Sequence, residues 1–153
     1  MEFNPENIVV KRCAEGMSLE GAGKTAEAAQ VFWQAWREAT LDLEKFISAH
    51  YVARHQKNVA DKLAWDKTAL AFALKIKEEN MKAHLPSLYL NIAKCHEDMG
   101  DGEEAKKNYF LAQDFSEHLT DDGYGQMTKA GIARGMERIS CAHSKTPEGC
   151  TDV

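Results

Sequence analysis

The sequence predicts an all-α fold of about seven helices that pack as antiparallel pairs. Apolar residues recur at helical spacing along most of the 153 residues, and no segment shows the alternating pattern of a strand. There are only three prolines among many Ala, Leu, Glu and Lys residues, which favour helix. With 44% hydrophobic and 28% charged residues, the chain has the composition and length of one domain with a sizeable core.

Two helices are expected first, over residues 7–20 and 25–38. Gly21 and Gly23 end the first helix, because glycine readily closes a helix in the left-handed conformation. Thr25 then supplies an N-cap for the second. Small and bulky apolar residues share one face of that second helix, so a neighbouring helix can approach it closely. They are Ala28, Ala29, Phe32, Ala35 and Trp36.

A third helix is expected over 41–56 and a fourth from Asn58 to about residue 79. Asn58 is a suitable N-cap, and Asp61 falls in the first turn, where the helix dipole favours a negative charge. The third and fourth helices together are expected to form one pair over 41–79. Residues 80–85 are expected to connect this pair to the next helix.

Three more helices complete the chain. Pro86 suits the first turn of a fifth helix, and Asp101, with Glu104 three residues on, predicts the start of a sixth. These two helices make a pair over 86–118. A closing helix over 122–139 follows, and residues 140–153 have no helical period, so we expect a loose tail. The domain prediction is therefore a helical unit over 5–139, whose first pair spans about 5–39.

The first and last pairs carry the same six-residue pattern, which indicates an internal repeat. The spacings are three, four, five, four and three residues in both copies. The first copy consists of Gly16, Leu19, Gly23, Ala28, Phe32 and Ala35. The second copy consists of Ala93, His96, Gly100, Ala105, Tyr109 and Ala112.

This pattern resembles the tetratricopeptide repeat (TPR), a unit of two antiparallel helices of about 34 residues with small residues where the helices touch. The likeness is to small stand-alone bacterial-type members of that family. His96 departs from the family pattern, in which a large apolar residue is usual. The middle pair breaks the register, although Ala53 and Ala64 are candidates for its small contact positions. The resemblance implies a short right-handed superhelix whose first helices line a concave groove.

The same resemblance implies that the protein is a non-catalytic scaffold or adaptor that binds a protein or peptide in this groove. A groove of mixed charge suits a peptide with a charged end. The alternative for each charged residue is an ordinary solvated side chain. The groove candidates are Met17, Glu20, His50, Arg54, Lys94, Asp98 and Lys129.

The segment HYVARHQ holds the residues with the most distinctive chemistry. His50 and Arg54 are four residues apart and share a helix face, so Arg54 could grip a carboxylate with two parallel hydrogen bonds. The structural alternative pairs Arg54 with an acid and half-buries the histidines. Both interpretations stay open for His50 and Arg54, whereas the structural one is favoured for His55. A His–Asp pair with Asp66 is conceivable, but no nucleophile accompanies it.

The remaining motifs predict neither a cofactor nor a metal. The run from Gly21 to Thr25 looks like the end of a phosphate-binding loop, but Ser18 stands where the motif needs glycine. Cys141, His143 and Cys150 offer three metal ligands without a fourth. The cysteines form no CxxC pair, and the N-terminus has neither a basic start nor a long apolar run. We therefore expect a cytoplasmic protein with free thiols and no membrane partner.

Two other functions stay as alternatives. One is an enzyme that acts on nucleic acid. Some similar small bacterial proteins are labelled as nucleic-acid methyltransferases. The net charge of −5 argues against a nucleic-acid partner, and no glycine-rich cofactor loop follows a strand. The other is a self-associating structural protein, a homo-oligomer formed through the exposed ends of the array.

Overall fold

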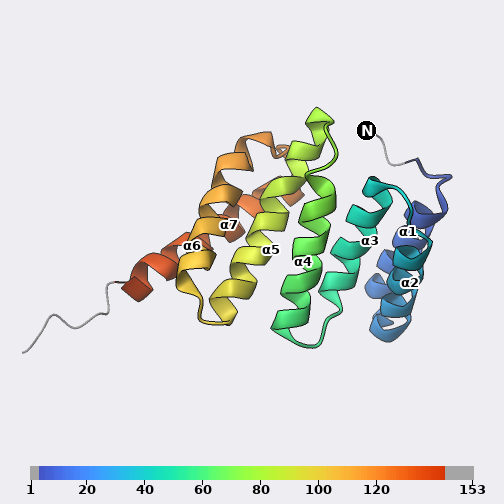
Figure 1. Ribbon diagram of the computed structural model, residues 1–153, viewed down its shortest axis with the longest axis horizontal. Helices are drawn as coiled ribbons and strands as arrows, with labels where there is room; N and C mark the ends of the chain where they lie inside the picture. Colours follow the sequence, from blue (N-terminus) through green and yellow to red (C-terminus); the bar gives the residue numbers. More distant parts are fainter. Residues whose placement is uncertain (1–3, 144–153) are drawn as a thin grey trace, which may run out of the picture.

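Seven α-helices follow one another in residues 4–143, the part of the protein that the computed structural model describes (Figure 1). They are α1 (Ile8–Gly21), α2 (Thr25–Glu38), α3 (Asp42–Arg54), α4 (Val59–Ala73), α5 (Leu85–Asp98), α6 (Gly102–Asp114) and α7 (Gly123–His143). Two short 3-10 segments, η1 (Glu79–His84) and η2 (Phe115–His118), precede α5 and follow α6. No strand occurs within these residues, which confirms the all-α prediction.

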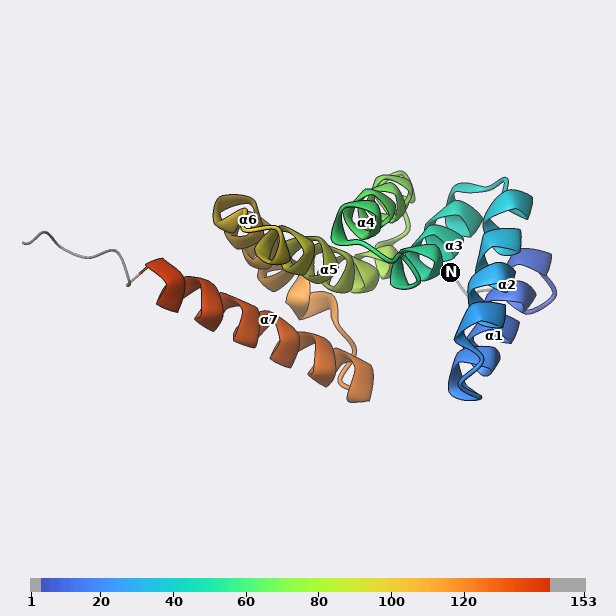
Figure 2. The ribbon, with the colours of Figure 1, turned by 90° about the horizontal axis from the view of Figure 1, so that it is seen from below.

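The helices pack as three neighbouring pairs, α1 with α2, α3 with α4 and α5 with α6. Figure 1 shows the pairs side by side in one row, joined through contacts of α2 with α3 and of α4 with α5. In Figure 2 the helix α7 crosses the side of the row on which α1, α3 and α5 lie. We call this side the inner face. The contacts of α7 are with α5 and α6, so it closes the last pair.

Two predicted boundaries are wrong. Helix α4 ends at Ala73, so residues 74–78 leave the helix before η1 begins. Helix α7 continues through His143, so residues 140–143 are helical rather than part of a loose tail. The rest of that predicted tail, 144–153, lies outside the described residues.

Side-chain caps start α1, α4 and α6. Asn7 Oδ1 accepts from the backbone N–H groups of Val9 and Val10, which caps α1. Asn7 Nδ2 also donates to Glu44 Oε1 at 2.7 Å and thereby joins the starts of α1 and α3. Asn58 and Asp101 cap α4 and α6 as predicted. These bonds satisfy backbone donors that a helix start leaves free.

The predicted cap of α2 is wrong. Lys24 occupies the N-cap position and makes no capping bond through its side chain, and Thr25 is already the first helical residue. The run from Gly21 to Thr25 is nevertheless a turn between two helices, as the repeat pattern predicts. Gly23 has a φ of 75°, and its counterpart Gly100 has a φ of 79°. Both repeat positions therefore use the left-handed conformation that glycine adopts without strain.

Small residues let the paired helices approach closely. A Cβ atom at Gly16 would overlap the ring of Phe32, which is fully buried. The alanines at the repeat positions are also fully buried; they are Ala28, Ala35, Ala93, Ala105 and Ala112. Leu19, another repeat position, is partly buried and packs against the cluster of Ala28, Phe32 and Val52.

The equivalent ring in the last pair makes a further contact. Tyr109, at the position of Phe32, lies against Gly135 of α7, where a Cβ atom would overlap its ring. His96, the departure from the apolar pattern, is buried, and its Nδ1 lies 3.3 Å from Asp101 Oδ2. A carboxylate within reach compensates a buried imidazole.

The middle pair uses other small residues than the sequence predicts. Ala53 of α3 is fully buried, as expected, whereas Ala64 of α4 is exposed. The buried alanines of α4 are Ala69 and Ala73 instead. The middle pair is therefore close-packed with a register of its own.

Replacing Gly16 with alanine is expected to lower the free energy of unfolding by about 1–3 kcal/mol, because the added methyl overlaps a ring that packing holds in place. Gly21→Ala on the same helix is the matched control, since nothing lies within 4 Å of its Cβ position. That control should be more stable than the wild type by up to about 1 kcal/mol. Urea denaturation measures both, and equal stabilities of the two variants would contradict the packing argument.

Candidate binding site

A cavity of about 300 Å³ opens on the inner face where α1, α3, η1 and the start of α7 meet. Helix α1 contributes one stripe of residues at helical spacing: Val10, Cys13, Ala14 and Met17. Helix α3 contributes a second stripe: Phe46, Ile47, His50 and Tyr51. His84 and Tyr124 complete the lining from η1 and α7. The packing of α1 against α3 makes these stripes adjoining walls, and it brings together two predicted groove residues, Met17 and His50.

His50 is the most unusual polar group of this cavity. Its ring packs edge to face on Tyr51, with the ring centres 5.5 Å apart. Its Nδ1 atom is buried and has no hydrogen-bond partner. Burial lowers the pKa of His50 to about 4, and the positive charges of Arg54 and Lys62 act in the same direction. The imidazole is therefore neutral at neutral pH.

Three other titratable groups of the lining are uncharged as well. Burial raises the pKa of the Cys13 thiol to about 12 and lowers the pKa of His84. Burial also raises the pKa of Tyr51, whose hydroxyl donates to Met17 Sδ at 2.9 Å. The His84 ring packs edge to face on Phe46 at 5.7 Å. The cavity wall therefore presents aliphatic and ring surfaces with a few neutral polar atoms.

Arg54, the candidate carboxylate-binding residue, is already paired with a glutamate of the protein itself. Arg54 Nη2 lies 3.1 Å from Glu20 Oε2, and His55 Nε2 lies 2.8 Å from Glu20 Oε1. Arg54 also lies over the ring of Tyr51 at 5.5 Å. Glu20, Arg54 and His55 therefore form a polar cluster that joins α1 and α3, which is the structural alternative for this segment.

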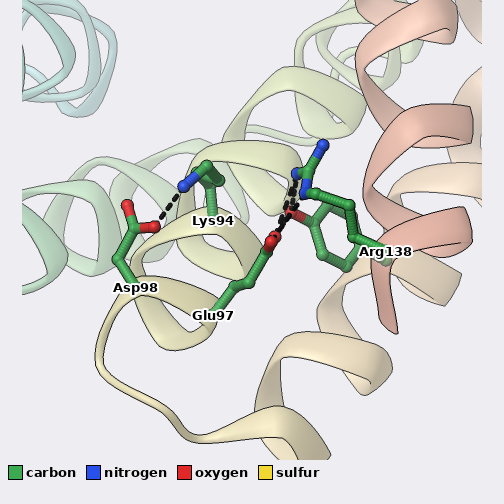
Figure 3. A network of polar contacts seen from close by, with 5 residues as sticks. Lys94, Glu97, Asp98 and Arg138 are labelled. Atoms are coloured by element: carbon green, nitrogen blue, oxygen red, sulfur yellow. Dashed lines mark hydrogen bonds and ion pairs between the residues drawn. The ribbon is translucent and has the colours of Figure 1, made fainter. Parts of the chain in front are cut away.

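The other predicted groove residues lie away from the cavity. Lys94 pairs with Asp98, one turn later on α5 (Figure 3). Lys129 lines a second cavity, of about 180 Å³, with Gln113 and Ser116 on the α6 side of α7. Lys94, Asp98 and Lys129 are therefore not part of the cavity lining that Met17 and His50 share.

A network that the sequence did not predict anchors α7. Arg138 donates to Glu97 through Nε at 2.6 Å and through Nη2 at 3.0 Å, as Figure 3 shows. Tyr109 donates to the same carboxylate at 2.5 Å and accepts from Arg138 at 3.2 Å. The guanidinium of Arg138 lowers the pKa of Glu97. This network fixes α7 to α5 and α6, and so sets where the start of α7 meets the cavity.

Asp66 does not form the His–Asp pair that the sequence made conceivable, because its carboxylate contacts Lys62 and Cys95 instead. Asp66 is fully buried, and its Oδ2 accepts from Lys62 Nζ at 2.5 Å and contacts Cys95 Sγ at 3.7 Å. Burial raises the pKa of this carboxyl. Asp66 is thus part of the packing between α4 and α5.

The described residues hold no group of three or more His, Cys, Asp or Glu side chains that could bind a metal. Of the three residues that the sequence offers as metal ligands without a fourth, Cys141 lies on α7, the side chain of His143 is outside the described set, and so is the whole of Cys150. In residues 4–143 no helix is long and apolar enough to cross a membrane.

Comparisons of the chain with family models, with curated proteins and with solved structures found no match. The tetratricopeptide resemblance therefore depends on the twelve repeat residues alone.

Replacing His50 with phenylalanine is expected to reduce the acid sensitivity of the protein. The folded state resists protonation of His50 down to about pH 4, whereas the unfolded chain binds that proton near the ordinary pKa of 6.5. Wild-type stability therefore falls as the pH drops from 6.5 to about 4. His50→Phe should lose on the order of 2–3 kcal/mol less over that interval, as measured by urea denaturation. Parallel curves for His50→Phe and the wild type would refute the prediction.

Replacing Arg138 with methionine is expected to lower the free energy of unfolding by about 1 kcal/mol at neutral pH, because the pair is partly exposed and screened by solvent. The folded-state pKa of Glu97 lies below its ordinary value of 4.5, so the contribution is present above 4.5 and is lost as the pH falls further. The difference from wild type should therefore vanish in acid. Arg134→Met, an exposed change one turn earlier, is the control. A difference that persists unchanged in acid would argue against the ion pair.

Proposed function

We propose that the protein is a non-catalytic adaptor that binds a segment of a partner protein on its inner face. The observation that carries this proposal is the open, largely apolar cavity between α1, α3 and the start of α7. Clefts of about this volume, with apolar walls and a few placed polar groups, are the usual form of a binding site. The resemblance of the twelve repeat residues to tetratricopeptide repeats supports the same function, since such arrays generally offer an extended binding surface.

The apolar surface continues beyond the cavity. Met17 and Tyr124, which both line it, are 43% and 44% exposed. Met127, one turn after Tyr124 on α7, is 63% exposed. Large apolar side chains that lie together on a protein surface often mark an interaction site. A partner segment that lies along α7 would cover them together with the cavity.

The ion pairs of the inner face change the kind of peptide that is expected. Arg54 is paired with Glu20, and Lys94 with Asp98, so neither cation is free to hold a terminal carboxylate. Capture of a charged peptide end would first have to break one of these pairs. We therefore propose that apolar contacts in the cavity supply most of the affinity, in place of the charged-end recognition that the sequence suggested.

A displayed library of random peptides tests the proposal and does not require an identified partner. Peptides selected on the wild-type protein should bind at least about tenfold more weakly to Met17→Glu, because this change places a charge at the cavity mouth. Met99→Glu is the matched control, since Met99 is also exposed, at 52%, and ends α5 away from the cavity. Binding to the control should be unchanged. Failure to select any peptide, or equal losses in both variants, would refute the proposed function.

A further inference from the structure

The shape and chemistry of the cavity restrict what a partner can place in it. Its volume of about 300 Å³ is at the lower end for ligand sites, so it suits one ring-sized group rather than an extended cofactor. Two helix stripes, η1 and α7 close it on several sides. A group that enters it therefore contacts protein on several sides and keeps one side towards the opening, as an anchor residue that projects from a bound segment would.

Rings make up much of the cavity wall. Phe46 and Tyr51 stand on α3 beside His50, and Tyr124 reaches in from α7. Tyr51 is held in place from behind by Phe32, whose ring stacks on it at 4.7 Å with an angle of 7° between the planes. Aromatic rings prefer offset-stacked or edge-to-face contacts with other rings over contacts with aliphatic groups of the same area. Such a wall favours an aromatic occupant.

The absence of charge on the lining restricts the occupant further. His50, His84, Cys13 and Tyr51 are all neutral at neutral pH because burial disfavours their charged forms. A charged side chain that entered would lose its hydration without gaining an opposite charge. An uncharged group loses less, and the few polar atoms of the wall can bond to one hydroxyl or N–H.

We propose that the cavity takes one tyrosine or tryptophan side chain of the partner protein, with the flanking peptide lying on Met17, Tyr124 and Met127. The exposed rim is the reason to assign the ring to a polypeptide. A free small molecule would fill the cavity and leave Met127, which is not part of its lining, uncovered. This inference rests on the proposed function, because it specifies the residue by which a bound segment is anchored.

The first test uses four small probes on the isotope-labelled protein, followed by NMR. N-acetyl-tryptophanamide and N-acetyl-tyrosinamide should shift the backbone resonances of residues 13–17 and 46–51, and should bind at least about fivefold more tightly than N-acetyl-leucinamide. N-acetyl-lysinamide should not bind. Equal binding of the leucine probe, or binding of the lysine probe at the cavity, would overturn the aromatic assignment.

The matched variants are Ala14→Phe and Ala71→Phe. Ala14 is exposed and lines the cavity, so a phenylalanine there fills the cavity without disturbing the core. Ala71 is an exposed alanine in the middle of α4. Ala14→Phe should weaken binding of the tryptophan probe about tenfold or more, whereas Ala71→Phe should leave it unchanged. Thermal unfolding checks that both variants fold, and equal affinities of the two folded variants would overturn the proposal.

The peptides selected by display separate this inference from the proposed function. If they bind through the cavity and lose about tenfold or more in affinity when their tyrosine or tryptophan becomes leucine, both proposals are supported. If they bind through the cavity with an aliphatic anchor, the adaptor function stands and the aromatic assignment fails. If the free probe binds as tightly as the peptides, the site is one for a small molecule. If Ala14→Phe instead dissociates a dimer of the unbound protein, the occupant is a second copy of the chain; both results overturn the assignment.

Discussion

The arrangement of the helices depends on two aromatic rings that lie directly on the backbone of a glycine. Phe32 lies on Gly16, and Tyr109, at the equivalent repeat position, lies on Gly135. In each case a Cβ atom at the glycine would overlap the ring, so the ring or the helices would have to shift. The two contacts differ in what they join, since the first holds α1 to α2 and the second holds α7 to α6. Such close packing leaves little room for the joined helices to change their positions relative to each other.

The cavity follows from these two contacts. Phe32 stacks on Tyr51 and so sets the position of a cavity wall relative to α1, while the hydroxyl of Tyr51 bonds to Met17 across the opening. At the other end of the molecule, Tyr109 and Arg138 fix the body of α7. The start of that helix then carries Tyr124 to the mouth of the cavity. The walls are thus held by the same packing that defines the repeat.

The sequence predicted the parts of the fold that depend on local chemistry. The turn glycines Gly23 and Gly100 have the expected left-handed conformation, and Asn58 and Asp101 cap their helices, because both features are determined within a few residues. The predicted cap of α2 was wrong, because Thr25 is already the first helical residue and Lys24 occupies the N-cap position. Ala64 was also wrong as a contact position, because the middle pair has no glycine turn to fix its register.

The candidate site was predictable only in part, because it depends on contacts between distant segments. Met17 and His50 could be placed on the inner face from helix order alone. The pairing of Arg138 with Glu97 spans 41 residues, and no local pattern connects the two. The pairing of Glu20 with Arg54 also decides whether that arginine is free, and the sequence left this open. The neutral state of His50 depends on burial, which emerges only when α1, α3 and η1 meet.

The proposed function requires that a partner segment binds on the inner face, over the cavity. Hydrogen exchange of the backbone amides, with and without a saturating peptide selected on the wild-type protein, tests it most directly. We expect slower exchange in α1, in α3 and at the start of α7, with little change in α2 and α4 beyond a uniform gain in global stability. Protection centred on α2 and α4, with α1 and α3 unaffected, would contradict it.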